Sequence, residues 1–162
     1  MRSWYTRPIE IRNLFNPAFC ALVLCRAFNG YQELKEDGMP FSLSLLVLPL
    51  CLHKQSREII NGNNKTYLLK VIERNPQLLL GFDGRVSDML PFTFEGLGIA
   101  MQFGCIEVTV KGALRISPDS IQKTVSGTQE TKEIQRAARM VGKGFAETLD
   151  RVTIYTSLGI RP

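Results

Sequence analysis

The chain has 162 residues, of which 44% are hydrophobic and 22% are charged, so it is too apolar to be disordered and long enough for a single domain over residues 1–162. Its net charge of +5 is too small to identify a nucleic-acid-binding protein by itself. The most apolar stretch, residues 41–52, is too short to cross a bilayer as a helix, so we expect no membrane contact. The four cysteines are expected to be free thiols, which predicts a cytoplasmic location.

The N-terminal region is expected to lead into a helix. Residues 1–12 are expected to be extended. Asn16 and Pro17 then indicate a helix start, because Asn caps free backbone amides and Pro is well tolerated at the first helical position. Apolar residues follow at helical spacing, which predicts an N-terminal helical region over residues 12–36 that ends before Gly38.

The central apolar stretch is predicted to be a core element. We expect residues 38–57 to form a buried helix, bent or broken near Pro49, because proline removes one backbone donor and clashes with the preceding turn. A buried strand is the alternative, since periodicity does not separate the two in a short apolar run. The Asn- and Gly-rich residues 61–64 indicate a turn, and residues 67–74 have the spacing of a helix.

The order of elements in residues 86–116 is that of a winged helix-turn-helix unit. Residues 86–90 suggest a short helix, Pro91 a break, and residues 92–103 a second helix. Residues 106–116 alternate apolar and polar side chains around a Lys-Gly turn, which predicts a short β-hairpin as the wing. A generic helix followed by a hairpin has the same order.

The C-terminal third is predicted to contain a loop, a helix and a docked tail, which together are expected to span residues 117–162. Residues 117–129 are polar and indicate a solvated loop. The remaining region, 130–162, begins with an amphipathic helix and ends in an apolar tail, which is expected to dock on the domain or on a partner. The predicted fold class is therefore mainly α (α+β). The expected apolar face of the helix is Ile134, Ala138, Val141 and Phe145.

The sequence offers little for catalysis. It has no glycine-rich phosphate loop and no G-x-S-x-G motif. His53 lies near Cys51 and Ser56, but a histidine that satisfies a helix end is the simpler interpretation. A metal site at Cys51 and His53 lacks further ligands at suitable spacing. We therefore expect no enzyme, no cofactor, no metal and no small-molecule substrate. Four buried free thiols are expected in a reducing compartment: Cys20, Cys25, Cys51 and Cys105.

Basic residues in two regions are weak candidates for nucleic-acid contact. The helix expected over residues 92–103 has no Lys or Arg, although a recognition helix normally carries groups for base edges and phosphates. The basic residues elsewhere are more typical of a solvated surface than of a nucleic-acid contact. These candidates are Lys111 and Arg115 on the hairpin, and Arg136, Arg139 and Lys143 on the C-terminal helix.

Three blocks of sequence resemble a known family. They are Arg7-Pro8-x-Glu10 leading into NLFNPAFC, then GMPF followed by LVLPLCLHK and RE within residues 38–58, and finally TIYTSLGIRP at residues 153–162. As a set, they resemble the middle components of bacterial three-component ABC (ABC-3C) systems, a group that includes the small subunit of Lamassu-type antiphage defence. The pair Gly142 and Gly144 departs from the bulkier aromatic pattern expected in the C-terminal helix.

The resemblance implies a winged-helix-like, non-catalytic accessory subunit. It would join an ABC ATPase of the SMC/Rad50 type to an effector, often a nuclease, and restrain the effector until foreign DNA is sensed. DNA would be contacted mainly through the complex. A free-standing winged-helix DNA-binding regulator is the alternative. The candidate partner-binding residues are Trp4, Arg7, Pro8, Glu10, Asn13, Leu14, Phe15, His53, Lys54, Arg57, Tyr155, Leu158, Gly159, Ile160, Arg161 and Pro162.

Overall fold

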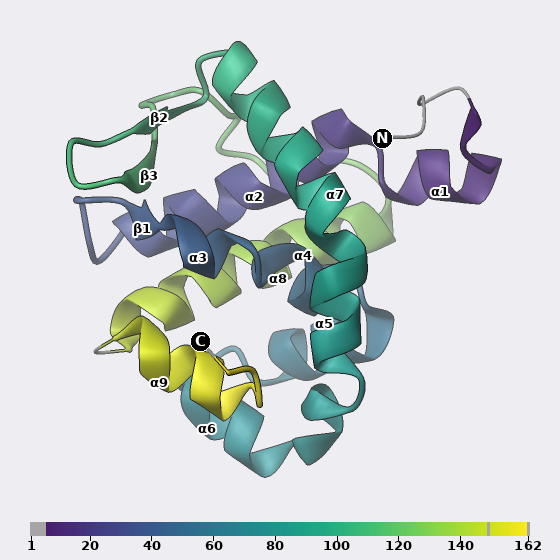
Figure 1. Cartoon of the computed structure of the whole chain (residues 1–162), viewed down its shortest axis with the longest axis vertical. Coiled ribbons are helices and arrows are strands. Elements are labelled where there is room, and N and C mark those ends of the chain that lie inside the picture. The colour runs from purple at the N-terminus through teal and green to yellow at the C-terminus, as the bar shows by residue number, and fades with distance from the viewer. Residues whose placement is uncertain (1–5, 149, 162) are drawn as a thin grey trace.

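A long, mostly buried helix, α2 (Pro17–Gln32), forms the centre of this computed structural model, which describes residues 6–148 and 150–161. Helix α8 (Gln129–Glu147) packs along one side of α2, and helix α7 (Phe82–Gln102) along another (Figure 1). The mainly α class with a small antiparallel sheet is confirmed. The other elements are α1 (Ile9–Leu14), α3 (Phe41–Ser44), α4 (Val47–Cys51), α5 (Lys54–Gly62), α6 (Leu68–Arg74), the 3-10 helix η2 (Pro76–Leu79), α9 (Arg151–Ser157), β1 (Met39–Pro40), β2 (Ile106–Val108) and β3 (Ala113–Ile116).

Helix α2 begins as the sequence predicts. The Asn16 side chain accepts hydrogen bonds from the backbone N–H groups of Ala18 (2.9 Å) and Phe19 (3.4 Å). The expectation that residues 1–12 are extended is wrong for Ile9 onward, because α1 forms there. The N–H of Arg12 donates to the carbonyl of Pro8 at 3.0 Å, which closes the first turn of α1.

Helices α2 and α8 cross at a very short distance. A Cβ on Gly30 would lie 2.1 Å from the carbonyl oxygen of Arg139, and a Cβ on Gly142 would lie 1.9 Å from that of Ala27. Only glycine permits helix backbones to approach so closely. Gly144 is similarly tight, because a Cβ there would lie 2.5 Å from the Cβ of Leu68. The two glycines that depart from the expected aromatic pattern are therefore explained by packing.

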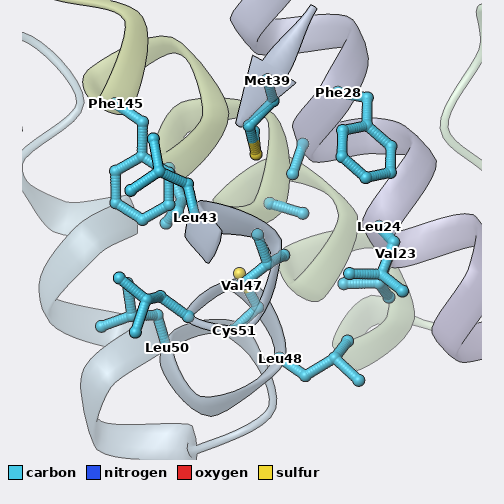
Figure 2. Close-up of a cluster of buried hydrophobic side chains, with 14 of the residues drawn as sticks. Val23, Leu24, Phe28, Met39, Leu43, Val47, Leu48, Leu50, Cys51 and Phe145 are labelled. Atoms are coloured by element: carbon cyan, nitrogen blue, oxygen red, sulfur yellow. The ribbon is translucent and has the colours of Figure 1, made fainter. Parts of the chain in front are cut away.

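The central apolar segment forms the core beside α2 as expected, but its break is not at Pro49. The segment divides into α3, α4 and α5, and the first interruption falls between Ser44 and Val47. Pro49 lies in the first turn of α4, where a backbone N–H has no partner within the helix, so proline causes no loss there. Figure 2 shows the buried side chains of this segment with those of α2 and α8: Val23, Leu24, Phe28, Met39, Leu43, Val47, Leu48, Leu50, Cys51 and Phe145.

Gly38 serves as an entry into a strand rather than as the end of α2. Its φ is +92°, and a Cβ there would lie 2.7 Å from the carbonyl oxygen of Leu114. The next residue, Met39, pairs with Leu114, so β1 joins the hairpin in a sheet of order β1-β3-β2. The hairpin itself, β2 and β3, is antiparallel as predicted. The sequence analysis did not predict β1.

The expected break at Pro91 is wrong. Helix α7 runs continuously through this proline, so the two short helices of the expected helix-turn-helix are one helix. Pro91 is exposed, whereas Leu97 and Ala100 on another side of α7 are buried in the core. Burial of that side stabilises α7 despite the hydrogen bond lost at proline. The helix ends before Gly104, whose φ is +67°, as predicted.

The C-terminal region follows the prediction closely. Residues 117–128 form no helix or strand, and Thr128 caps α8 by accepting from the N–H of Thr131 at 3.3 Å. The predicted apolar face of α8 is buried. The tail docks on the domain, because Ile154 and Leu158 are each only 1% exposed.

Candidate interaction site

The described residues show no metal-ligand cluster, and three of the cysteines are deeply buried. Residues 6–148 and 150–161 contain no group of three or more His, Cys, Asp or Glu side chains that could hold a metal ion. None of the helices in these same ranges is long and apolar enough to span a bilayer. Burial raises the pKa of Cys20 and Cys25 to about 12, and it also raises the pKa of the fully buried Cys51. These thiols are therefore protonated and unreactive near neutral pH.

The polar end of the central segment is a structural cluster built around Arg57, which is only 2% exposed. Its Nη1 donates to the backbone carbonyls of Cys51 (3.2 Å) and Leu52 (3.3 Å), and its Nη2 donates to Oε1 of Glu130 at 3.0 Å. Arg57 thereby connects the end of α4 to the first turn of α8. Because it is buried, its side chain is not available to a partner.

His53 and Lys54 lie at the start of α5. Nδ1 of His53 accepts from the N–H of Ser56 at 3.4 Å and lies 2.9 Å from the Ser56 hydroxyl, so His53 caps the helix. Burial and the nearby charges of Arg85 and Arg57 lower the pKa of His53, which favours the neutral form that accepts a hydrogen bond. Lys54 is exposed and lies 3.9 Å from Glu58.

The N-terminal block packs against one flank of α7. Arg7 forms a two-point ion pair with Glu95, with Nη1–Oε2 at 2.9 Å and Nη2–Oε1 at 2.5 Å. The Arg7 guanidinium also lies 5.4 Å from the centre of the Phe92 ring, and the Phe15 ring stacks on Phe92 with centroids 4.2 Å apart. Pro8, Glu10 and Asn13 are exposed along this segment. Trp4, Pro162 and the side chain of Leu14 lie outside what the structure describes.

The second block reaches the opposite flank of α7. The Phe41 ring of α3 stacks on Phe94 of α7, with ring centroids 6.3 Å apart. Because Phe92 and Phe94 are two positions apart on a helix, they point to opposite sides of α7. In Figure 1, α1 and α3 accordingly lie on either side of α7.

The third block joins the second. The Tyr155 hydroxyl of α9 donates to the backbone carbonyl of Ser42 at 2.6 Å, next to Phe41. Leu158 is buried and Ile160 is half-buried, whereas Gly159 and Arg161 are exposed. Tyr155, Leu158 and Ile160 therefore contact this chain itself. The first block therefore contacts one flank of α7, whereas the second and third blocks contact each other at the other flank.

An apolar surface lies between the flanks of α7. We call the exposed residues Pro91, Phe94, Gly98 and Met101 the outer face of α7. None of them is charged, and Glu95 beside them is held by Arg7. Phe94 and Met101 are 46% and 40% exposed, and Phe41 next to Phe94 is 41% exposed. An uncharged, partly aromatic surface of this kind is typical of a protein interface.

Sequence reasoning missed the outer face of α7. It predicted a helix over residues 92–103 but gave no sign that Phe94 and Phe103 are exposed, at 46% and 75%. One sequence pattern could have indicated this surface: residues 89–106 contain only one charged residue, Glu95, although the helix in this region is too long for every side to be buried.

The basic candidates for nucleic-acid contact are exposed, and several are paired. Lys111 contacts Asp37 at 2.9 Å, Arg115 pairs with Glu107 across the hairpin, and Arg139 contacts Glu33 at 2.6 Å. Arg136 and Lys143 are exposed on α8. The paired carboxylates reduce the positive charge that the hairpin offers to phosphates. DNA contact by these residues stays a prediction.

Comparison with known proteins gives one family. Residues 4–162 match the family model described as ABC-three component (ABC-3C) system Middle Component 3. No curated protein and no solved structure matches the chain. The family match covers nearly the whole sequence, including all three blocks.

Proposed function

The chain belongs to the Middle Component 3 family of ABC-3C systems and is thereby a component of a multi-component system; from this premise we propose that it is a non-catalytic accessory subunit that joins an SMC/Rad50-like ABC ATPase to an effector. In this role it restrains the effector until foreign DNA is sensed, as in antiphage defence. The proposal requires surfaces for two partners and no catalytic group.

The outer face of α7 is the observation that carries this proposal. Phe41, Phe94 and Met101 are each at least 40% exposed, and the outer face bears no charge. Exposure of such side chains to water is unfavourable, by about 25 cal/mol for each Å² of apolar surface, so burial against another subunit stabilises the complex. We propose that an ATPase or effector subunit binds here.

The family-resembling blocks support this placement. The N-terminal block fixes one flank of α7 through Arg7 and Glu95, and the second block fixes the other through Phe41. The C-terminal block supports α3 through Tyr155. We infer that these blocks mainly hold the outer face of α7 in a fixed shape, while their exposed residues, such as Pro8, contribute at its edges.

The exposed ends supply the second contact in this proposal. Glu10 and Asn13 on α1, with Gly159 and Arg161 beyond α9, lie outside the core. Deletion of the whole tail is not a clean test of that contact, because Ile154 is a core residue and its removal would destabilise the fold. Point substitution of Arg161 tests the tail without this loss.

Co-expression of this chain with the ATPase and the effector that are encoded beside it tests the proposed role. A complex of all three is expected to purify together, and leaving this chain out is expected to separate the effector from the ATPase. The purified chain alone should have no nuclease or ATPase activity. An ATPase–effector complex that forms equally well without this chain would contradict a joining role.

A further inference from the structure

Arg26 is a buried cation without an anionic partner. It lies in the middle of α2 and is only 4% exposed. Its Nε donates to Oε1 of Gln135 at 3.1 Å and its Nη2 donates to the carbonyl of Thr124 at 3.3 Å. Both acceptors are neutral, and no carboxylate within the described ranges lies at ion-pair distance from Arg26. Burial lowers the pKa of Arg26, but an arginine remains charged in proteins.

Arg57, the other fully buried arginine among the described residues, does have an anionic partner. Arg57 also donates to backbone carbonyls, but its charge is balanced by Glu130. A buried charge without a counter-ion is costly, and such a charge is ordinarily paired. Arg26 therefore lacks a partner that its environment favours.

A surface groove opens beside Arg26. Nη1 of Arg26 has no hydrogen-bond partner among the described residues and is not sealed off from solvent. The groove's other polar lining comes from α2 and from the loop after β3. These residues are Asn29, Gln32, Ser117, Ser120 and Lys123, with Asp119 among them. The groove thus combines a buried guanidinium with an exposed ammonium, two hydroxyls, two amides and one carboxylate.

Hydrogen bonds fix the loop that forms this groove. The backbone N–H of Ile116 donates to Oε1 of Gln32 at 2.5 Å, at the start of the loop. Nε2 of Gln135 donates to the carbonyl of Ser126 at 3.0 Å, near its end. Between these two positions, Nη2 of Arg26 donates to the backbone carbonyl of Thr124. The groove is therefore preorganised before any ligand binds.

We propose that this groove binds a small oxyanion of the phosphate class, either free or as the terminal group of a larger ligand. Arg26 supplies the buried charge through Nη1, and Lys123 supplies a second positive charge at the rim. A tetrahedral anion has enough acceptor oxygens for donors that converge from several directions, whereas a carboxylate has two. Asp119 at the rim opposes binding and limits affinity.

Titration of the full-length chain with inorganic phosphate, at constant ionic strength, tests this site. Wild type is expected to bind saturably. Arg26→Gln should weaken binding at least about tenfold, because a charge-assisted hydrogen bond is lost. Lys123→Gln should weaken it about two- to fivefold, and Asp119→Asn should strengthen it by a similar factor, as expected for exposed charges. Circular dichroism verifies that each variant is folded.

The exposed variants keep the test decisive if Arg26→Gln fails to fold. Opposite effects of Lys123→Gln and Asp119→Asn would then support the site. Adenosine monophosphate serves as a second probe: tighter binding than inorganic phosphate would identify a larger phosphorylated ligand, and equal binding would identify the free anion. No saturable binding, phosphate affinity that is equal in all variants, or equally tight binding of malonate would overturn the proposal.

Discussion

The rings of Phe41 and Phe94 stack with centroids 6.3 Å apart and planes 21° from parallel, while both side chains remain more than two-fifths exposed. A stacked aromatic pair contributes about 0.5–1.5 kcal/mol beyond its buried area. This contact connects α3 to α7 and leaves both side chains partly on the surface. Their exposed surfaces continue the outer face of α7, which is the central feature of the proposed function.

Gly142 and Gly98 are predicted to respond oppositely to a methyl group. Gly142→Ala would place a Cβ 1.9 Å from the carbonyl oxygen of Ala27, so the crossing of α2 and α8 must open. We expect a loss of about 3 kcal/mol or more in the free energy of unfolding. Gly98→Ala meets no atom within 4 Å and should raise stability by about 1 kcal/mol. Urea unfolding measures both, and a loss of similar size in both variants would disprove the close crossing.

Arg57 is predicted to matter more to stability than the charged residues near it. Arg57→Met leaves the carbonyls of Cys51 and Leu52 without their donor, and should cost about 3 kcal/mol. Glu130→Gln should cost about 1–2 kcal/mol, because Glu130 is 64% exposed but its loss leaves the buried Arg57 without a counter-ion. Lys54→Met is the control and should change stability by less than about 0.5 kcal/mol. Equal effects of Arg57→Met and Lys54→Met in chemical unfolding would contradict the buried cluster.

His53 is predicted to make stability fall in mild acid. Its pKa is lowered in the folded state, so the unfolded chain binds a proton at a higher pH than the folded chain. The contribution of neutral His53 to the free energy of unfolding is fully present above the usual histidine pKa of about 6.5. It is lost as the pH falls through the lower pKa of His53 in the folded state. His53→Asn keeps a good capping side chain but cannot titrate. Since His53 is the single histidine, the variant should lose this pH dependence in thermal unfolding between about pH 7.5 and 5.5. An unchanged pH profile would refute the assignment.

Thiol reagents are predicted to distinguish Cys105 from the other cysteines. Cys20, Cys25 and Cys51 are buried and have raised pKa values, whereas Cys105 is half-buried. At neutral pH the native protein should be labelled slowly, at Cys105, and the unfolded protein at all four cysteines. Mass spectrometry of labelled peptides gives the sites. Rapid native labelling of Cys51 would point instead to a reactive pair with His53.

Local features of the fold could be predicted from the sequence because local contacts determine them. Asn16 caps the amides two and three residues ahead, and Gly112 takes a φ of +76° in the turn of the predicted hairpin. The sequence did not show that the helix continues through Pro91. The packing of α7 against α2 and α4 outweighs the local preference for a break at this proline. β1 is two residues long and exists only through its pairing with Ala113 and Leu114.

The candidate site depended on long-range packing. The three blocks could be recognised in the sequence. The contacts of Arg7 with Glu95 and of Tyr155 with Ser42 could not be predicted from it. Apolar spacing in α7 cannot separate the buried Leu97 from the exposed Phe94, because both are large apolar residues on one helix. Only the surrounding helices decide which side of α7 faces the core.

The central claim is that another subunit of the ABC-3C system binds the outer face of α7. Phe94→Glu places a charge in this surface, where Phe94 is 46% exposed, so the fold should tolerate it. Leu80→Glu is the matched control, because Leu80 is a 72% exposed apolar residue outside the outer face of α7. Thermal unfolding verifies that both variants are folded.

Affinity purification of the co-expressed ATPase, effector and this chain is the most direct measurement of that claim. Phe94→Glu is expected to lose at least one partner while Leu80→Glu retains both, because a buried charge without a partner is strongly unfavourable at an interface. A folded Phe94→Glu chain that still purifies with both partners in wild-type amounts would contradict the account.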